Sequence, residues 1–453
     1  MEREELMEQM KELVLTMLEE RRFKELKDEL ETMHPVDVAE MLEEFDDKQM
    51  ILVFRLLAKD EAAETFAEMT NDMREVLLNK LTDSEIKEFM DEMYLDDTVD
   101  VLEEMPANVV DRLLNIADEE TRTQINTLLK YPEDSAGSIM NVEYIAFNKE
   151  MTVEDAILKI RQVGLNRETI YTCYVLEKRK LVGVVSLKDL LTSGDNRTIE
   201  EIMETNMLYV RTLDDQEEVA SMISKYNLIA IPVVDNDMRM VGIVTVDDAM
   251  DVLEEETTED MSMMVGIAPN EDSYFETSIW EHAKSRIPWL LFLMLSATLS
   301  GLALGRFEYA LTVMPILNTF VPMLTGTGGN CGSQSSTLVI RGLATDEIGF
   351  KDLLKVLFKE LRVAFLVGVM LAVVNGIRIM LMYSGNWMLA VTLGITLICT
   401  VILAKIIGCA LPLVAEKLGL DPALMAAPLI TTLVDTGTIL LYFTIATKIF
   451  GIS

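Results

Sequence analysis

A carboxylate, Asp435, interrupts an apolar stretch, Pro428 to Lys448, that is long enough to cross a bilayer. An ionised group at membrane depth costs about 2.5 kcal/mol or more even on lenient insertion scales, so it needs a water-filled path or a partner. We interpret Asp435 as a candidate cation site. A structural carboxylate, hydrogen-bonded between helices, is the alternative. Thr431 lies one turn earlier on the same helical face and could offer a second oxygen.

A second unusual run is rich in glycine and polar side chains. It covers 325–336 (TGTGGNCGSQSS) and follows Pro315 and Pro322. Such a run makes a poor lipid-facing helix, but it allows close backbone approach and leaves carbonyl and side-chain oxygens available to line a path. Together with Asp435, it indicates an ion pathway.

A third group of oxygen ligands lies on an acidic helix at 247–260, which contains no Lys or Arg. Spacings of three and four place Asp248, Asp251 and Glu255 on one face, and Glu256 and Glu259 on a neighbouring one. Like charges at these spacings destabilise a helix. We expect cations to neutralise them, although a merely solvated acidic surface is the simpler alternative.

The charge divides the chain into two parts of opposite character. Residues 284–453 carry 12 Lys and Arg against 8 Asp and Glu, so the remaining 27 and 68 give residues 1–283 a net charge of −41. This charge argues against nucleic acid as a partner and against anionic lipid surfaces. The acidic start MEREELMEQM lacks the basic and apolar regions of a signal peptide, so we expect the amino-terminal part in the cytosol.

Helical periodicity extends over residues 1–131 and predicts an all-α array of short helices. A weak echo between 38–45 (VAEMLEEF) and 99–105 (VDVLEEM) is typical of a helical repeat. After this part, 173–189 aligns with 231–248, each copy reading as strand, turn, strand and helix, preceded by amphipathic helices at 152–163 and 215–226.

These two copies resemble a tandem pair of α/β CBS domains. In that family a Ser/Thr-x-x-Asp motif at the end of the second strand can hold a nucleotide ribose, which makes Ser186 with Asp189 and Thr245 with Asp248 candidates. Simple helix capping by the same hydroxyls is equally compatible with the pattern.

The remaining sequence predicts a membrane domain of about five helical spans, placed near 287–305, 310–340, 355–382, 387–415 and 425–450. Basic residues collect at the flanks that would face the cytosol, which predicts a carboxyl terminus outside. Lys405 falls within the fourth span, where it could snorkel or pair with a neighbour.

Taken in order, these features resemble the MgtE family of magnesium transporters over essentially the whole chain. The resemblance rests on 33–40 (MHPVDVAE), 131–137 (YPEDSAG), the CBS pair, 328–334 (GGNCGSQ) and 431–435 (TTLVD). It implies five parts: a helical domain at 1–131, CBS domains at 138–200 and 201–260, a connecting helix at 261–286 and a transmembrane domain at 287–453.

The resemblance also implies a homodimer in a prokaryotic plasma (inner) membrane that imports Mg²⁺ and is closed by cytosolic Mg²⁺. The implied pore residues are Asp435, Thr431, Asn330, Gly328 and Gly329. The implied sensor residues are Asp96, Asp100, Asp248, Asp251, Glu256, Glu259 and Asp421. One departure is Ala427, where relatives often have a polar Asn.

The chain contains no nucleotide-hydrolysing motif or catalytic cluster, so we do not expect an enzyme. Two alternatives stay open. One is transport of another divalent cation such as Co²⁺, Mn²⁺ or Ca²⁺. The other is a membrane-anchored sensor whose CBS pair binds a nucleotide; ATP could also bind as a modulator of a transporter.

Overall fold

The computed structural model describes the chain except residues 1, 270–273, 275–276, 346, 384, 426 and 453, and it leaves out the side chains of 2–6, 104, 120, 166, 425, 427 and 428. The described residues form two compact units, Met1–Leu253 and Glu254–Ser453.

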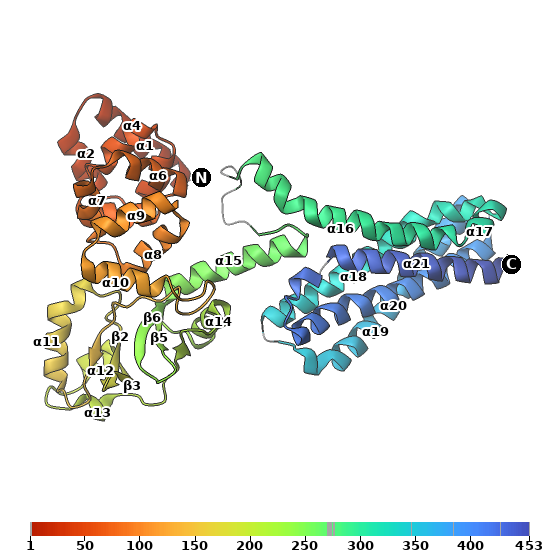
Figure 1. Ribbon diagram of the computed structural model, residues 1–453. Coiled ribbons are helices and arrows are strands. Elements are labelled where there is room, and N and C mark those ends of the chain that lie inside the picture. Colours follow the sequence, from red (N-terminus) through yellow and green to blue (C-terminus); the bar gives the residue numbers. More distant parts are fainter. Residues whose placement is uncertain are drawn as a thin grey trace. The chain divides into compact units, whose positions relative to one another are not determined.

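Short helices make up the amino-terminal part of the first unit, as the periodicity predicts (Figure 1). Most of them begin at an extended residue and end after two or three turns. Their bounds are α1 (Glu2–Glu19), α2 (Phe23–Leu30), α3 (Pro35–Glu43), α4 (Asp47–Phe54), α5 (Lys59–Ala67), α6 (Asn71–Lys80), α7 (Asp83–Met90), α8 (Leu95–Glu104), α9 (Ala107–Ile116) and α10 (Glu119–Leu128).

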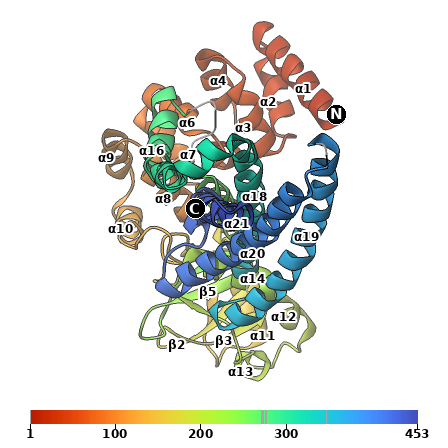
Figure 2. The same cartoon turned by 90° about the vertical axis from the view of Figure 1, so that its right-hand side faces the viewer.

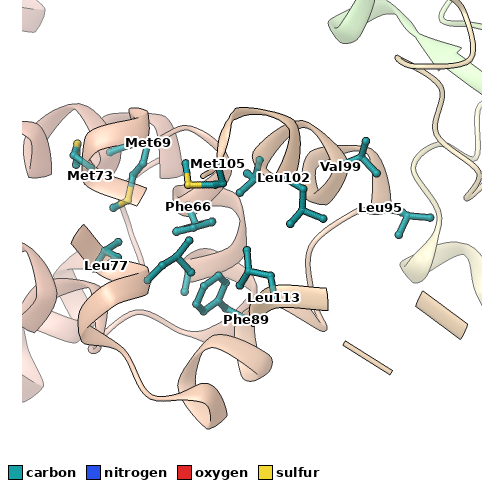
Figure 3. Close-up of a cluster of buried hydrophobic side chains, with 14 of the residues drawn as sticks. Phe66, Met69, Met73, Leu77, Phe89, Leu95, Val99, Leu102, Met105 and Leu113 are labelled. Atoms are coloured by element: carbon teal, nitrogen blue, oxygen red, sulfur yellow. The ribbon is translucent and has the colours of Figure 1, made fainter. Parts of the chain in front are cut away.

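The core of this helical array is built from aromatic and methionine side chains. Phe66 on α5 packs against Phe89 on α7 with ring centroids 4.9 Å apart, and both rings also approach Phe54 of α4. Figure 3 shows Met105, which follows α8, and Leu113 of α9 in the same cluster. The Met-rich helical faces are therefore core.

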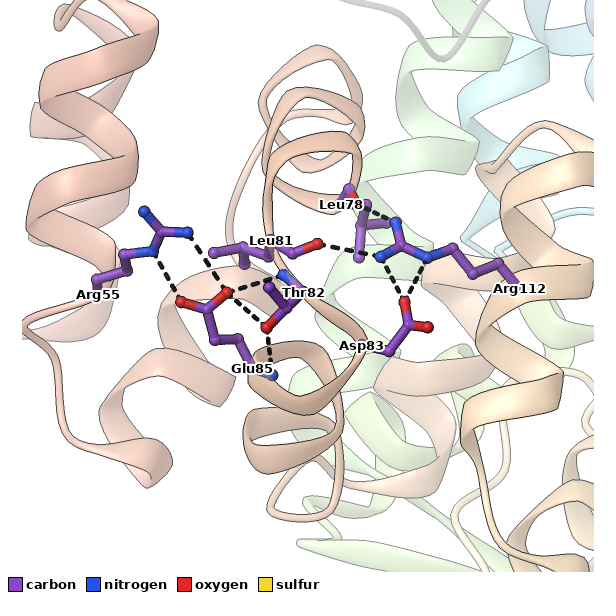
Figure 4. Close-up of polar contacts among 7 residues, drawn as sticks. All are labelled: Arg55, Leu78, Leu81, Thr82, Asp83, Glu85 and Arg112. Atoms are coloured by element: carbon purple, nitrogen blue, oxygen red, sulfur yellow. Dashed lines mark hydrogen bonds and ion pairs between the residues drawn. The ribbon is translucent and has the colours of Figure 1, made fainter.

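Polar contacts hold α6, α7 and α9 together (Figure 4). Arg112 binds the carboxylate of Asp83 at 2.6 Å and the carbonyl oxygen of Leu81 at 3.0 Å, and it also contacts the carbonyl of Leu78. At the start of α7, Thr82 and Glu85 form a capping box. These contacts satisfy carbonyl groups at the end of α6 that the helix itself leaves unpaired.

Two α/β repeats follow, with the strand pattern expected from the alignment. In each, a short strand pairs parallel to the second strand, which pairs antiparallel to the third. The first contains β1 (Ala146–Phe147), α11 (Val153–Val163), η1 (Gly164–Asn166), β2 (Thr172–Glu177), β3 (Lys180–Ser186), α12 (Leu187–Thr192) and α13 (Ile199–Ile202). The second contains β4 (Val210–Arg211), α14 (Gln216–Tyr226), β5 (Ala230–Val234) and β6 (Met240–Thr245).

The acidic helix α15 (Val246–Met264) follows β6, begins in the first unit and ends in the second. The second unit continues with α16 (Ile279–Gly305), α17 (Glu308–Val313), η2 (Pro315–Phe320), α18 (Val321–Ala344), η3 (Phe350–Asp352), α19 (Leu353–Met382), α20 (Trp387–Leu418), η4 (Ala423–Met425) and α21 (Ala427–Phe450). Segment 261–286, expected as one connecting helix, thus holds the end of α15 and the start of α16.

The long helices of the second unit form a bundle in which α20 packs between α18 and α19, while α21 contacts α16, α18 and α20. Figure 2 shows α19 and α20 side by side along their length. Four segments of the described residues are long and apolar enough to span a membrane: Ile279–Gly305, Phe350–Met382, Trp387–Leu418 and Leu429–Phe450.

The predicted second span, 310–340, is wrong as a single helix. It divides into α17, the 3-10 helix η2 and α18. Pro315 lies in the first turn of η2 and Pro322 in the first turn of α18, where a missing backbone N–H breaks no helical hydrogen bond. The two prolines therefore mark helix starts, and the glycine-rich run belongs entirely to α18.

Candidate functional site

Asp435 lies in the middle of α21, on the helix that contacts α16, α18 and α20. Its side chain is half-buried, and its Oδ1 atom is buried without a hydrogen bond from any residue that the structure describes. A buried carboxylate oxygen without a donor is costly, and a cation is one group that can satisfy it. This orphaned oxygen fits a cation ligand and argues against an Asp hydrogen-bonded between helices.

The glycines of α18 bring this helix against α20 and α21. A Cβ atom on Gly328 would lie 2.8 Å from the Thr400 Cγ2 atom and 3.2 Å from the Thr438 hydroxyl oxygen, and one on Gly329 would lie 3.1 Å from the Thr431 Cγ2 atom. Larger residues would separate the helices. The glycines thus place α18 beside the turn of α21 that carries Thr431 and Asp435.

The glycine-rich run at 325–336 stays helical throughout. The run was expected to leave backbone carbonyls available to an ion, but residues 325–336 are continuous α-helix. Carbonyls inside a helix accept hydrogen bonds from their own helix, as an apolar environment requires. The run therefore provides close packing more than carbonyl ligands.

Two threonines near Gly328 were missed by the sequence reasoning. The hydroxyls of Thr400 on α20 and Thr438 on α21 are buried and make no hydrogen bond within the described residues. Thr438 follows Asp435 by three residues, so helical spacing could have indicated it. Nothing in the sequence points to Thr400, because it reaches the site only through the packing of α20.

The remaining candidate pore residues do not converge within one chain. Thr431 is half-buried on the Gly329 side of α21, whereas Asn330 is exposed on α18. The side chain of Ala427, at the start of α21, lies outside the described residues.

A first group of carboxylates is formed by residues of α8 and of the start of α15, inside the first unit. Burial and then the charges of Asp97 and Asp248 raise the pKa of Asp96 well above its ordinary value. Asp96 is 8% exposed, and its Oδ1 atom is buried with no hydrogen bond from the described residues. Such an oxygen fits a cation ligand in the same way as that of Asp435.

Asp97 and Glu168 also belong to this group, although the sequence did not predict them. Burial and Asp248 raise the pKa of Asp97 to about 6, and burial followed by Asp247 and Asp248 raises the pKa of Glu168 to about 7. Asp97 is adjacent to Asp96, which is a usable sequence signal. Glu168 precedes β2 in the first repeat, and only the folding of that repeat against α8 and α15 brings it here.

A second group lies in the other unit, on the last part of α15 and the loop after α20. Burial, then the charges of Asp421 and Glu256, raise the pKa of Asp260 to about 6. The expected sensor residues Glu256 and Asp421 thus both lie near Asp260, a further carboxylate of the acidic helix. Glu259 is half-buried on the same helix.

Two other predicted sensor residues, Asp100 on α8 and Asp251 on α15, are exposed. Among the residues that the structure describes, no three His, Cys, Asp or Glu side chains converge as a complete metal-binding group. Within each acidic group, the described carboxylates therefore lie close without forming a closed coordination shell.

The two candidate nucleotide motifs act as helix caps. The Ser186 hydroxyl donates to the Asp189 carboxylate at 2.5 Å and accepts from the backbone N–H of Asp189 at 3.1 Å. The Thr245 hydroxyl donates to Asp248 at 2.6 Å. Asp189 is exposed, whereas Asp248 lies in the acidic group beside Asp96.

Comparison with known protein families matches each part of the chain. Residues 33–134 match the MgtE intracellular N domain, 136–195 and 199–255 match CBS domains, and 321–445 match MgtE, described as a divalent cation transporter.

Curated relatives resemble the chain over nearly its whole length. A magnesium transporter MgtE of Thermus thermophilus is 37% identical over 95% of this chain and 96% of its own. One of Bacillus subtilis is 33% identical over 96% of both.

Two solved structures match the cytosolic part. The soluble part of a magnesium transporter is 31% identical, with a TM-score of 0.53, and covers 55% of this chain and 99% of its own. The cytosolic domain of the Mg²⁺ channel MgtE in complex with ATP is 37% identical, with a TM-score of 0.51, over 53% and 98%. The expected fold and the expected absence of enzymatic activity are thereby confirmed, and the chain belongs to the MgtE family of magnesium transporters.

Proposed function

We propose that this multi-pass membrane protein is a channel-type importer of Mg²⁺ whose path runs past Asp435. The observation that carries the proposal is the buried Oδ1 atom of Asp435, which no described residue satisfies. The magnesium-transporter names of the relatives support the choice of ion. An inside-negative potential supplies about 4.6 kcal/mol per 100 mV for a divalent ion, so the path needs no hydrolysable nucleotide.

Mg²⁺ gives up its water reluctantly and prefers one or two carboxylates plus retained waters. A pair of Asp435 side chains, one from each chain of a homodimer, meets this description better than a closed set of protein ligands. The exposed position of Asn330 is compatible with a contribution across such an interface. We include Thr431, Gly328 and Gly329 among the residues of the path.

Uptake of Mg²⁺ into proteoliposomes tests this proposal. Asp435→Asn and Asp435→Ala are expected to lower uptake at least tenfold, because the ion loses its charged ligand. Thr447→Val is a matched control on the same helix, since the Thr447 hydroxyl donates to the carbonyl of Phe443 at 2.8 Å. Uptake that survives both Asp435 substitutions would contradict the proposal.

We propose further that cytosolic Mg²⁺ closes the path by binding between the carboxylates within each acidic group. Unit charges of the same sign about 4 Å apart repel by roughly 4 kcal/mol at a surface-like dielectric, so facing carboxylates separate unless cations lie between them. The raised pKa values of Asp96, Asp97 and Asp260 support this mechanism. The other expected sensor residues belong to the same proposal: Asp100, Asp248, Asp251, Glu256, Glu259 and Asp421.

Protease protection tests the gating step. With about 10 mM Mg²⁺ the cytosolic part is expected to resist digestion, and without Mg²⁺ it is expected to be cleaved faster near 254–278. An Asp96→Asn, Asp260→Asn double variant should lose most of the difference. Identical digestion of the wild type under both conditions would rule out the sensor.

A modulating nucleotide is a second proposal, supported by the ATP complex of a homologous cytosolic domain. The Ser186–Asp189 pair is the better ribose site, since Asp189 is exposed and Asp248 lies among carboxylates that would repel phosphates. Asp189→Ala should abolish ATP binding measured by calorimetry, and Asp248→Ala should retain it.

The proposal also covers the assembly, the location, the topology and the domain boundaries of the protein. The homodimer, the plasma-membrane location in a prokaryote and the external carboxyl terminus belong to it, as do the domain boundaries 1–131, 138–200, 201–260, 261–286 and 287–453. Competing flux of Mg²⁺, Mn²⁺ and Co²⁺ would establish the ranking of the ions.

A further inference from the structure

A buried ion pair and a hydroxyl join three helices of the membrane unit. The Lys405 Nζ atom on α20 lies 2.8 Å from the Glu360 Oε2 atom on α19 and 2.9 Å from the Ser335 hydroxyl on α18. The Ser335 hydroxyl donates to the same oxygen of Glu360 at 3.0 Å. The side chains of Lys405 and Glu360 are only 7% and 14% exposed.

Lys405 is an unusual partner for Glu360 because closer basic residues are present in the sequence. Lys359 and Arg362 flank Glu360 on α19, but both are exposed, and Lys355 pairs with Asp352 at 2.6 Å. Lys405 instead lies within Trp387–Leu418, a segment long and apolar enough to span a membrane. An ammonium group in such a span is expensive unless a partner neutralises it, so the two residues have to be explained together.

The pair lies on the same surface of α18 as the glycines of the candidate path. Gly332 and Gly408 mark where α18 and α20 pack most closely, since a Cβ atom on Gly408 would lie 2.3 Å from the Gly332 carbonyl oxygen. Ser335 follows Gly332 by one turn and Gly328 by two, a rise of about 10 Å. Ser335, which contacts Glu360, therefore lies on the same face of α18 as the glycines packed beside Thr431 and Thr438.

We propose that Lys405 is a specificity-determining residue whose ammonium group occupies the place that a divalent cation would otherwise take on Glu360. A carboxylate beside a hydroxyl offers the oxygen ligands that Mg²⁺ and Ca²⁺ accept. If the Glu360 carboxylate were free, it would bind the ion in addition to Asp435. Conduction requires binding that is weak enough for release. Lys405 therefore keeps Glu360 from acting as a trap. This inference rests on the proposed path past Asp435.

Ion binding by the full-length protein in detergent tests the proposal directly. Lys405→Met removes the tethered charge and leaves Glu360, so about 10 mM Mg²⁺ should raise its melting temperature about 3–6 °C more than it raises that of the wild type. The double variant that carries both Lys405→Met and Glu360→Gln should match the wild-type increment, because it lacks the carboxylate. The single variant Lys359→Met should also match it, because the Lys405–Glu360 pair stays intact. An increment in Lys405→Met equal to that of the wild type would overturn the proposal.

Flux provides the second measurement and separates this proposal from a purely structural pair. Lys405→Met should lower Mg²⁺ uptake about tenfold, while Lys405→Arg and the neutral double variant should keep at least half of it. A double variant as inactive as Lys405→Met would overturn the trap mechanism. If Lys405→Met does not fold, Lys405→Gln takes its place in both measurements.

The same set distinguishes failure of the path from failure of this inference. The single variant Asp435→Asn should abolish flux. The double variant that carries Asp435→Asn and Lys405→Met should still show the extra rise in melting temperature with Mg²⁺ that Lys405→Met shows alone. Normal flux in Asp435→Asn would reject the proposed path, while the increment would still report binding at Glu360.

Discussion

The hydroxyl of Ser300 on α16 lies 2.9 Å from the hydroxyl of Thr436 on α21, the residue that follows Asp435. One turn away, the hydroxyls of Ser296 and Thr432 are 3.2 Å apart. These two contacts join α16 to α21 on both sides of Asp435. A displacement of α16, the first long helix after the acidic helix α15, would therefore reach the candidate ion site directly.

Removing one of these contacts should alter gating more than conduction. Interhelical hydrogen bonds in membranes contribute about 0.6 kcal/mol on average, so Ser300→Ala is expected to shift the half-inhibitory Mg²⁺ concentration about threefold. Thr298→Ala is the control, because Thr298 is exposed on the same helix. An unchanged inhibition curve in Ser300→Ala would mean that the contact does not carry the coupling.

The unpaired hydroxyls of Thr400 and Thr438 give a prediction in which stability and activity move in opposite directions. Replacing either residue with Val removes a buried unsatisfied group, so stability should rise by about 1 kcal/mol. Uptake should fall several-fold, because the path loses an oxygen. Thr392→Val is the control, since its hydroxyl donates to the carbonyl of Met388 at 2.8 Å. Full uptake in both variants would exclude these threonines from the path.

The group around Asp96 and Glu168 predicts how pH and Mg²⁺ act together. The folded-state pKa values of Asp97, about 6, and Glu168, about 7, lie above ordinary values, so these groups bind protons more tightly when folded. Their contribution to stability is present at low pH and is lost as pH rises from about 4 through 7. Without Mg²⁺, the unfolding temperature of the cytosolic part should fall over this range.

Mg²⁺ should reverse that loss. Because protons and Mg²⁺ compete for the same oxygens, stabilisation by Mg²⁺ should be larger at pH 8 than at pH 5.5. Glu168→Gln should flatten the pH dependence, whereas Glu154→Gln, an exposed residue on α11, should leave it unchanged. Equal Mg²⁺ stabilisation at both pH values would contradict this account.

Removing the charge of Asp260 from the second acidic group should weaken the inhibition of flux by Mg²⁺. Asp260→Asn should reduce repulsion with Asp421 and Glu256 and leave fewer ligands for Mg²⁺. We expect flux that continues at Mg²⁺ concentrations several-fold above those that close the wild type. Glu254→Gln, an exposed residue of α15, serves as the control. Inhibition that is unchanged in Asp260→Asn would remove this residue from the sensor.

Two arginines of the helical array should differ in their effect on stability. Arg112→Met leaves the carbonyls of Leu78 and Leu81 without their donor, which should cost about 2 kcal/mol and speed hydrogen exchange in α6. Arg55→Met breaks an exposed pair with Glu85 and should cost less than about 1 kcal/mol. Equal exchange in the two variants would contradict this ranking.

The glycine-rich run illustrates what a local pattern can and cannot predict. Its composition indicated close helix packing, and Gly328, Gly329 and Gly332 indeed lie against α20 and α21. Composition could not tell whether the run unwinds to expose its carbonyls. That depends on which surfaces surround α18, because a backbone among apolar helices must satisfy its own hydrogen bonds.

The sequence by itself determined the order of the parts, four of the spans, the paired α/β repeats and Asp435, because periodicity, length and a charge in an apolar run are local properties. Only the tertiary structure placed Glu168 beside Asp96, Thr400 beside Gly328 and Lys405 on Glu360. Each of these relationships joins residues far apart in the chain, and the energies that create them, desolvation and charge pairing, depend on distances that exist only after packing.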